Sequence, residues 1–244
     1  MMLNYIKLFL SDLFHKGNYS SKEIIKDLRT KGYHYIPNFL SEEEIIIVTK
    51  DFESLYQDEN LVKSESNGCD LRIYGADERA NFKISKLDEF SIPLFKSFSF
   101  FRKAYHFILL GWLKKGKGNL GSGGGWHRDS PISHQFKTIL YLTDVDETNG
   151  PFQFIKGSQN WKNNLKVCKY LNLPLSNRRF KNEDIDSLIS QNVIPPPTTF
   201  TSKKGGLIIA DTRGLHRGKP LENGERKAIT RYHFTSDIGD KFYK

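Results

Sequence analysis

Three side chains of this sequence have the types and the spacing needed to bind one metal ion. His127 and Asp129 stand two residues apart, directly after the glycine run Gly123–Gly125. Side chains alternate along an extended chain, so these two point to the same side and can reach one ion. A second histidine, His216, follows the β-like run Leu207–Ala210. Two imidazoles and one carboxylate leave coordination positions open, which marks the sites of non-haem Fe(II) oxygenases.

The pair His127 and Asp129 alone does not decide between a metal site and a hydrogen bond at the end of a strand. The glycine run opens space around the pair, which favours the metal. His216 lies 216 − 127 = 89 residues further on, at the end of another β run. A jelly roll that returns to the same mouth requires such a position. We therefore predict that His127, Asp129 and His216 bind the metal and carry the catalysis.

Arg226 is suited to bind a carboxylate beside this site. It follows His216 by 226 − 216 = 10 residues, at the start of the next β run. A guanidinium binds a carboxylate through two parallel charge-assisted hydrogen bonds. We predict that Arg226 anchors the distal carboxylate of 2-oxoglutarate, and the alternative is a surface arginine in the cluster Glu225–Lys227. Thr138 and Tyr141, on the run after the metal motif, are further candidates for the cosubstrate pocket, with β-core packing as their alternative.

Helical patterns dominate the first part of the chain. We predict helices over Ser21–Arg29, from Ser41, where Glu44 completes a capping box, and within the aromatic-rich segment Phe90–Leu110. Beyond this point, glycines form a loop, and turn signals separate short β-like runs over Thr138–Thr143, Phe152–Ile155, Gly206–Ala210 and Ala228–Thr235. This order predicts a mainly β fold with flanking helices. Its core would be a double-stranded β-helix (jelly roll, cupin-like) with the N-terminal helices packed on it.

A length of 244 residues fits a single domain, 1–244. Within it we expect a helical N-terminal part with edge strands over 1–110 and the β-helix core over 111–240. The Lys- and Asn-rich segment at about 160–197 is predicted to be an insertion in this core, with a short helix around Glu183–Ile189. The sequence leaves open whether the insertion closes over the site as a lid.

The net charge, 37 − 28 = +9, is compatible with an anionic substrate or with nucleic acid. The basic residues are spread out, so a solvated basic surface is the better interpretation and a nucleic-acid partner is not expected. Two cysteines exclude a disulfide framework and favour a reducing, cytoplasmic location. The apolar stretch Met1–Phe14 is interrupted by Lys7 and Asp12 and is too short to span a bilayer. We expect it to form an amphipathic helix packed on the domain, and we expect no membrane partner.

Motifs along most of the chain are shared with one enzyme family. They lie in Lys31–Tyr33, Pro37–Glu44, Trp126–Asp129, Leu142–Val145, Asn149–Pro151, Ile155–Ser158, Gly206–Leu207, Leu215–Gly218 and Arg226–Ile229. Together they resemble the phytanoyl-CoA dioxygenase family, within the Fe(II)/2-oxoglutarate oxygenases of double-stranded β-helix fold. The resemblance implies that His127, Asp129 and His216 bind Fe(II), that Arg226 binds 2-oxoglutarate, and that O₂ is the co-reactant.

By this resemblance, the expected activity is hydroxylation of an unactivated C–H bond in a small molecule, with release of succinate and CO₂. An anionic substrate would suit the net charge, and both a monomer and a homodimer are compatible with the sequence. Three alternatives are weighed against this expectation. Halogenating relatives lack the carboxylate that Asp129 provides. Nucleic-acid demethylases of the superfamily carry a second arginine six residues after the first, whereas Arg231 follows Arg226 by 231 − 226 = 5. In a cupin-like binding protein without turnover, Arg226 would be idle.

Overall fold

Two antiparallel β-sheets form the centre of the protein. The computed structural model describes residues 19–65, 68–79, 82–116, 120–130 and 134–235, so the helix expected over Met1–Phe14 lies outside the described residues. The seven-stranded sheet contains, in spatial order, β1 (Tyr33–Ile36), β8 (Leu207–Ala210), β5 (Gln135–Tyr141), β10 (Glu225–Phe234), β4 (Tyr105–Lys114), β3 (Asp70–Tyr74) and β2 (Lys63–Glu65). The three-stranded sheet has the order β7 (Thr198–Phe200), β6 (Phe152–Phe154) and β9 (His216–Gly218).

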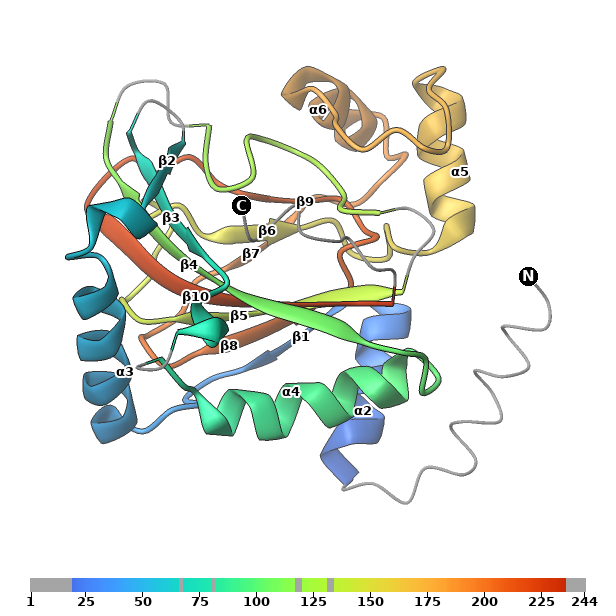
Figure 1. Cartoon of the computed structure of the whole chain (residues 1–244). Coiled ribbons are helices and arrows are strands. Elements are labelled where there is room, and N and C mark those ends of the chain that lie inside the picture. The colour runs from blue at the N-terminus through green and yellow to red at the C-terminus, as the bar shows by residue number, and fades with distance from the viewer. Residues whose placement is uncertain (1–18, 66–67, 80–81, 117–119, 131–133, 236–244) are drawn as a thin grey trace.

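Three helices cover the outer face of the large sheet (Figure 1). They are α2 (Tyr19–Thr30), α3 (Glu42–Leu55) and α4 (Ser85–Phe98). Two short 3-10 turns connect helices to strands: η1 (Glu59–Leu61) lies between α3 and β2, and η2 (Ala76–Glu78) lies between β3 and α4. The capping box predicted for α3 is present: the Glu44 amide donates to the Ser41 hydroxyl, and the Ser41 amide donates to the Glu44 carboxylate. The apolar stripes of these helices pack on the sheet and form the largest core of the molecule.

The pleat of the two central strands separates this core from the space between the sheets. Strand β5 pairs with β10 along its whole length: Gln135 lies opposite Phe234 at one end, and Tyr141 lies opposite Ala228 at the other. On β5, Phe136 and Leu140 face the helices, whereas Ile139 and Tyr141 pack in a second core with β6 and β7 of the small sheet. Alternate residues of one strand therefore serve two different environments, as the period of two requires. The antiparallel sheets and flanking helices confirm the predicted jelly-roll class.

The third predicted helix was wrong in its second half. Helix α4 ends at Phe98, and Phe100 and Phe101 take left-handed backbone angles, with φ of 61° and 57°. From Tyr105 the chain is the ten-residue strand β4, which crosses the expected boundary at residue 110. Its aromatic and aliphatic residues alternate between the two faces of the sheet. An apolar run that is buried on both faces has no polar face, so its period cannot distinguish a strand from a helix.

The insertion folds into two helices, α5 (Trp161–Tyr170) and α6 (Asn182–Ser190), which lie beside the small sheet (Figure 1). The position of α6 confirms the predicted short helix, whereas α5 was not predicted. Val167, Ile185 and Leu188 from the insertion share a buried cluster with Trp126 and Leu215. These last two residues directly precede the metal-ligand candidates His127 and His216, so the insertion is packed against the segments that carry them. No helix within the described ranges has both the length and the apolar character needed to cross a membrane.

Candidate metal centre

The two candidate histidines are held side by side by their own backbones. His127 and His216 form a β-bridge in which each amide donates to the other carbonyl over 2.9 Å, and their ring centroids are 4.3 Å apart. The Nδ1 atom of His127 lies 2.8 Å from the Gly125 carbonyl, and that of His216 lies 2.9 Å from the Gly214 carbonyl. A carbonyl only accepts, so Nδ1 carries the proton in both rings and Nε2 keeps a lone pair. Both imidazoles are thereby set to bind a metal through Nε2.

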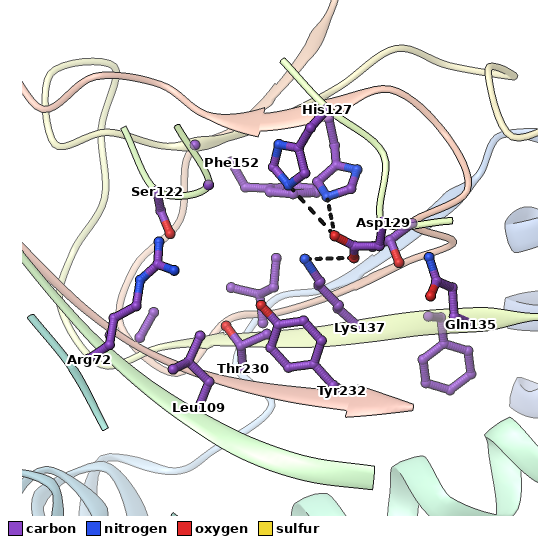
Figure 2. Close-up of a pocket in the computed structure, with 18 of the residues that line it drawn as sticks. Arg72, Leu109, Ser122, His127, Asp129, Gln135, Lys137, Phe152, Thr230 and Tyr232 are labelled. Atoms are coloured by element: carbon purple, nitrogen blue, oxygen red, sulfur yellow. Dashed lines mark ion pairs between the residues drawn. The ribbon is translucent and has the colours of Figure 1, made fainter. Parts of the chain in front are cut away.

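Asp129 faces both of these lone pairs. Its Oδ1 atom lies 3.7 Å from Nε2 of His127 and 3.9 Å from Nε2 of His216 (Figure 2). One ligand atom from each of the three residues lies within 4.8 Å of the others. Ligand atoms that each bind one ion at about 2.0–2.2 Å lie at most about 4.4 Å apart, and the two nitrogen–oxygen distances are within this limit. The arrangement therefore fits one small divalent ion with open positions on the side of the cavity.

Burial sets the protonation of the three side chains. Burial, together with the Lys137 cation, lowers the pKa of His127 to about 4, and burial lowers the pKa of His216 as well. Burial alone would raise the pKa of Asp129, but Lys137 and the two histidines hold it below its ordinary value. Near neutral pH the site thus presents two neutral imidazoles and one carboxylate. These are the protonation states that metal binding requires.

Lys137 is a functional residue that our sequence reasoning missed. It lies on β5, it is buried, and its Nζ atom is 2.7 Å from Oδ2 of Asp129, the carboxylate oxygen opposite Oδ1 (Figure 2). The same Nζ lies 4.5 Å from the ring centroid of Tyr232. The ion pair fixes the carboxylate so that Oδ1 points at the histidines. A lone lysine in the otherwise apolar segment Phe136–Leu142 was the signal that could have revealed it.

Arg226 lies in the same cavity as the three candidate ligands. It is 7% exposed, its Nη1 donates to the Gly150 carbonyl, and its Nε has no hydrogen-bond partner. Among the described residues no carboxylate forms an ion pair with it. Burying a cation without a counter-charge costs free energy, and an incoming carboxylate can offset this cost. The role of Arg226 in binding the distal carboxylate of 2-oxoglutarate stays a prediction.

The two other predicted cosubstrate residues lie in different places. Tyr141 faces the small sheet and is fully buried, and its hydroxyl accepts a hydrogen bond from the Phe152 amide over 2.9 Å. The Arg226 cation lowers the pKa of this phenol, against a larger opposite effect of burial, so the two side chains are electrostatic neighbours. Thr138 lies one position out of phase, between Lys137 and Ile139, on the helix-facing side of β5. Neither Thr138 nor Tyr141 is among the residues that line the cavity.

The glycine run lets the backbone approach His127 closely. Gly123 has φ of +89°, and a Cβ atom there would lie 2.3 Å from Cε1 of the His127 ring. A larger residue would therefore displace the imidazole or the loop. On the other flank of the motif, Arg128 points away from the metal site and donates to the carbonyls of Asn177 at 2.6 Å and Leu175 at 2.7 Å. Because side chains alternate along the segment, His127 and Asp129 face the metal site and Arg128 faces the insertion.

An ion pair between Asp211 and Arg213 closes the turn before His216. Asp211 is fully buried, and its Oδ1 atom accepts from Nε of Arg213 over 2.9 Å and from the Arg213 amide over 3.2 Å. The Gly214 amide also donates to the Asp211 carbonyl over 3.1 Å. These bonds close a tight turn, and its Gly214 carbonyl is the acceptor that orients the His216 ring. Asp211 and Arg213 therefore act on the site through the backbone.

The site opens into a cavity of ≈ 960 Å³ between the two sheets. Apolar and aromatic side chains from β4, β5, β6 and β10 form much of its wall: Phe107, Leu109, Ile139, Phe152, Ala228 and Phe234. Arg72 on β3 points across the cavity toward Ser122 (Figure 2) and pairs with Asp70 at 2.6 Å. A space of this size accommodates a cosubstrate and a second small molecule together.

Comparisons with known proteins agree with this geometry. The sequence model of the phytanoyl-CoA dioxygenase (PhyH) family matches residues 28–228, whereas no curated protein matches the chain at a significant level. Among solved structures, the epimerase SnoN in complex with Fe³⁺, alpha ketoglutarate and nogalamycin RO is similar with a TM-score of 0.65 and 14% identity, over 88% of this chain and 83% of that one.

Two further structures show how widely the fold is shared. The alpha ketoglutarate dependent carbocyclase SnoK from nogalamycin biosynthesis has a TM-score of 0.64 and 15% identity, over 95% and 90% of the two chains. A prolyl hydroxylase from Trichoplax adhaerens, in complex with a peptide fragment, has a TM-score of 0.58 and 16% identity, over 93% and 92%. At these identities the structures establish the fold alone. The family match, which spans most of the sequence, shows that the chain belongs to the phytanoyl-CoA dioxygenase family of Fe(II)- and 2-oxoglutarate-dependent oxygenases.

Proposed function

We propose that this protein is a dioxygenase that hydroxylates an unactivated C–H bond of a small molecule, using Fe(II), 2-oxoglutarate and O₂. The observation that carries the proposal is Arg226, a buried guanidinium without an acidic partner among the described residues, in the cavity that also contains the metal-ligand cluster. A binding protein with a purely structural metal has no use for a cation that is costly to bury. An enzyme that must hold a dicarboxylate beside its metal does.

The chain's own residues fit both groups. His127, Asp129 and His216 would hold iron, with both Nε2 lone pairs already directed toward Oδ1 of the carboxylate. When bound, iron and 2-oxoglutarate supply, with O₂, the oxidising power that a C–H bond requires, and succinate and CO₂ are released. Arg226 would hold the distal carboxylate, and Tyr141 supports that end of the cavity. The apolar wall excludes water from the place where the reaction occurs.

Several features support hydroxylation of a small molecule over its alternatives. Asp129 occupies the third ligand position, which halogenating relatives leave free for chloride. Arg231, which is one residue short of the second arginine position of nucleic-acid demethylases, lies on the other face of β10 and pairs with Asp88 at 2.5 Å. Cys69 and Cys168 form no disulfide, which supports a reducing, cytoplasmic location. SnoN and SnoK are named as an epimerase and a carbocyclase, so the fate of the oxidised carbon needs a direct test.

The test is a turnover assay with product analysis. The protein is loaded anaerobically with Fe(II) and 2-oxoglutarate, O₂ is admitted, and succinate is measured with and without a panel of small metabolites. We expect succinate formation that a substrate stimulates, and a product that gains one oxygen atom. Succinate no higher than in Asp129→Ala would refute the oxygenase. Substrate-dependent succinate with a product that has lost hydrogen, or has only been isomerised, would refute hydroxylation while leaving the oxygenase in place.

A further inference from the structure

We infer that the insertion supplies an anion-binding rim to the cavity, formed by Arg178 and Arg179, and that the substrate carries a phosphate or carboxylate group that binds there. Both residues line the cavity, and both side chains are exposed. The inference rests on the proposed function only in what happens to the substrate after it has bound. The position of the rim follows from contacts within the chain.

Backbone pairing fixes the rim next to the metal site. The Arg128 amide donates to the Arg178 carbonyl over 2.9 Å, and the Phe180 amide donates to the Trp126 carbonyl over 3.0 Å. Between these bonds, Arg179 forms an antiparallel β-bridge with His127. Residues directly opposite each other on paired strands project to the same face, with Cβ atoms about 4.5–5.5 Å apart. Arg179 is therefore an immediate neighbour of a metal-ligand candidate, and its position does not depend on a loose loop.

The two guanidinium groups are held differently. Nη1 of Arg179 donates to the Gly123 carbonyl and lies 3.5 Å from the Gly124 carbonyl, so this arginine joins the insertion to the glycine run. Two backbone carbonyls leave its positive charge unneutralised. For Arg178 the described part of the chain provides no side-chain hydrogen bond and no ion pair. Two adjacent cations at the mouth of a cavity, neither with a counter-charge there, form a site that attracts anions.

The charges of the cavity lining also indicate an anion-binding site at Arg178 and Arg179. Its described lining contains two carboxylates, Asp70 and Asp129, and five cations, namely Arg72, Lys137, Arg178, Arg179 and Arg226. Arg72 is paired with Asp70 at 2.6 Å, and Lys137 is paired with Asp129 at 2.7 Å. In the proposed function, Arg226 is paired with 2-oxoglutarate, and the charges of this dianion and of Fe(II) cancel. The excess of 5 − 2 = 3 positive charges therefore persists in the loaded enzyme, and two of the three belong to the rim.

The space between the rim and the metal defines the remainder of the substrate. Phe107, Leu109 and Phe152 contribute apolar wall to the cavity, and Phe152 lies 5.6 Å, between ring centroids, from His216. An apolar group against this wall gains free energy from burial, while an anionic group at its other end remains at the mouth. The geometry thus points to a substrate with one anionic end and an apolar part that carries the reacting carbon.

The rim can be tested by binding alone, before any substrate is identified. Protein loaded anaerobically with Fe(II) and saturating 2-oxoglutarate is titrated calorimetrically with phenyl phosphate, phenylacetate and the neutral 2-phenylethanol. We expect one anion per chain, bound more tightly than the neutral compound, and the tighter of the two anions identifies the preferred group. The double variant R178Q/R179Q should weaken anion binding by about tenfold or more, as the loss of charge-assisted hydrogen bonds implies. Equal affinities of wild type for all three probes would overturn the inference.

A charge-matched control separates the rim from the general basic surface. Lys162 and Lys169 are exposed on α5 of the same insertion and do not line the cavity, so K162Q/K169Q removes the same charge elsewhere. This variant should bind the anions within twofold of wild type, and equal weakening in both double variants would contradict the rim. The single variant R178Q keeps the contacts of Arg179 with the glycine run and should still weaken binding. None of these titrations requires turnover, so failure of the rim and failure of the oxygenase assay are separate results.

Discussion

The two faces of strand β10 carry one buried arginine each, and the two arginines are treated in opposite ways. Arg231, on the helix-facing side, is 2% exposed and forms an ion pair with Asp88 of α4 at 2.5 Å. Arg226, on the cavity side, is 7% exposed, and among the described residues no carboxylate pairs with it. Five residues separate them, and an odd separation places two side chains on opposite faces of a strand.

Under the proposed function, this difference separates a structural charge, Arg231, from a charge that is kept for a ligand, Arg226. Arg231 has a carboxylate partner within the protein and links a helix to the sheet. Arg226 has no such partner among the described residues, so the folded state retains the free-energy cost of a buried charge, which a bound anion offsets. Each of the following changes alters one face of the sheet and leaves the other intact.

The largest effect is expected for Arg226→Met. The variant loses both charge-assisted hydrogen bonds to the distal carboxylate, so the Kd for 2-oxoglutarate should rise on the order of 100-fold. The free energy of unfolding should not fall, because an uncompensated buried cation has been removed. Calorimetric titration with 2-oxoglutarate and chemical denaturation measure the two quantities. A marked loss of stability with unchanged affinity would make Arg226 a structural residue like Arg231.

The next effect concerns the metal and compares adjacent residues of β5. Lys137→Met removes the cation that holds Oδ2 of Asp129 and should weaken Fe(II) binding about 10- to 100-fold, the usual range for groups that orient a ligand. Thr138→Val is the matched control, because Thr138 faces the helices and its hydroxyl has no hydrogen-bond partner. It should leave the affinities for Fe(II) and for 2-oxoglutarate unchanged. Anaerobic metal titration measures the first effect, and equal losses in both variants would refute a specific role for Lys137.

Arg231→Met should affect stability alone. It leaves Asp88 without its partner, and because the Asp88 side chain is 38% exposed, solvent moderates the cost to about 1–2 kcal/mol. Chemical denaturation gives this value, and the Kd for 2-oxoglutarate should equal that of wild type. An increase in that Kd would show that the two faces of β10 are coupled, and the comparison above would fail.

The smallest effect is a change in the pH dependence of the free energy of unfolding, caused by His233. Burial and the nearby Arg231 hold the pKa of His233 well below its ordinary value of 6.5, and the ring packs against Phe95 and Phe136. Below pH 6.5 the unfolded chain binds a proton at this position that the folded chain does not, so stability is complete above pH 6.5 and falls as the pH decreases. His233→Phe should reduce this slope by up to about 1.4 kcal/mol per pH unit. Denaturation between pH 7 and pH 5 measures it, and an unchanged slope would contradict the assignment.

The sequence predicted most of the site because its residues obey simple spacing rules. The period of two places His127 and Asp129 on one side whatever the details of the fold, and Arg226 could be located relative to His216 because a single turn separates their strands. The faces of β5 were difficult to predict. All seven residues from Gln135 to Tyr141 are buried, so the strand has no solvent-exposed side, and Lys137 was the main sign of which side faces the cavity. Thr138 was selected where Lys137 contacts the site.

For the fold, too, the elements with one polar and one apolar face were predicted correctly, and an element buried on both sides was not. Amphipathic helices such as α3 leave a polar face to solvent, and this pattern is visible in the sequence. Strand β4 is largely buried on both sides and gave no such signal, so it was assigned to a helix. The role of Arg178 and Arg179 was invisible for another reason. Their position beside His127 results from a long-range backbone pairing. No local pattern in the Lys- and Asn-rich insertion predicts this pairing.

The outward direction of Arg128 has a consequence for how such an enzyme can change. In one short segment, His127 and Asp129 provide two of the three metal-ligand candidates, and Arg128 between them donates hydrogen bonds to the insertion. The metal-ligand candidates and the insertion are therefore joined at Arg128. Under the proposed function and the inferred rim, replacing the insertion with another that accepts Arg128 would change the substrate and leave the metal-ligand candidates in place.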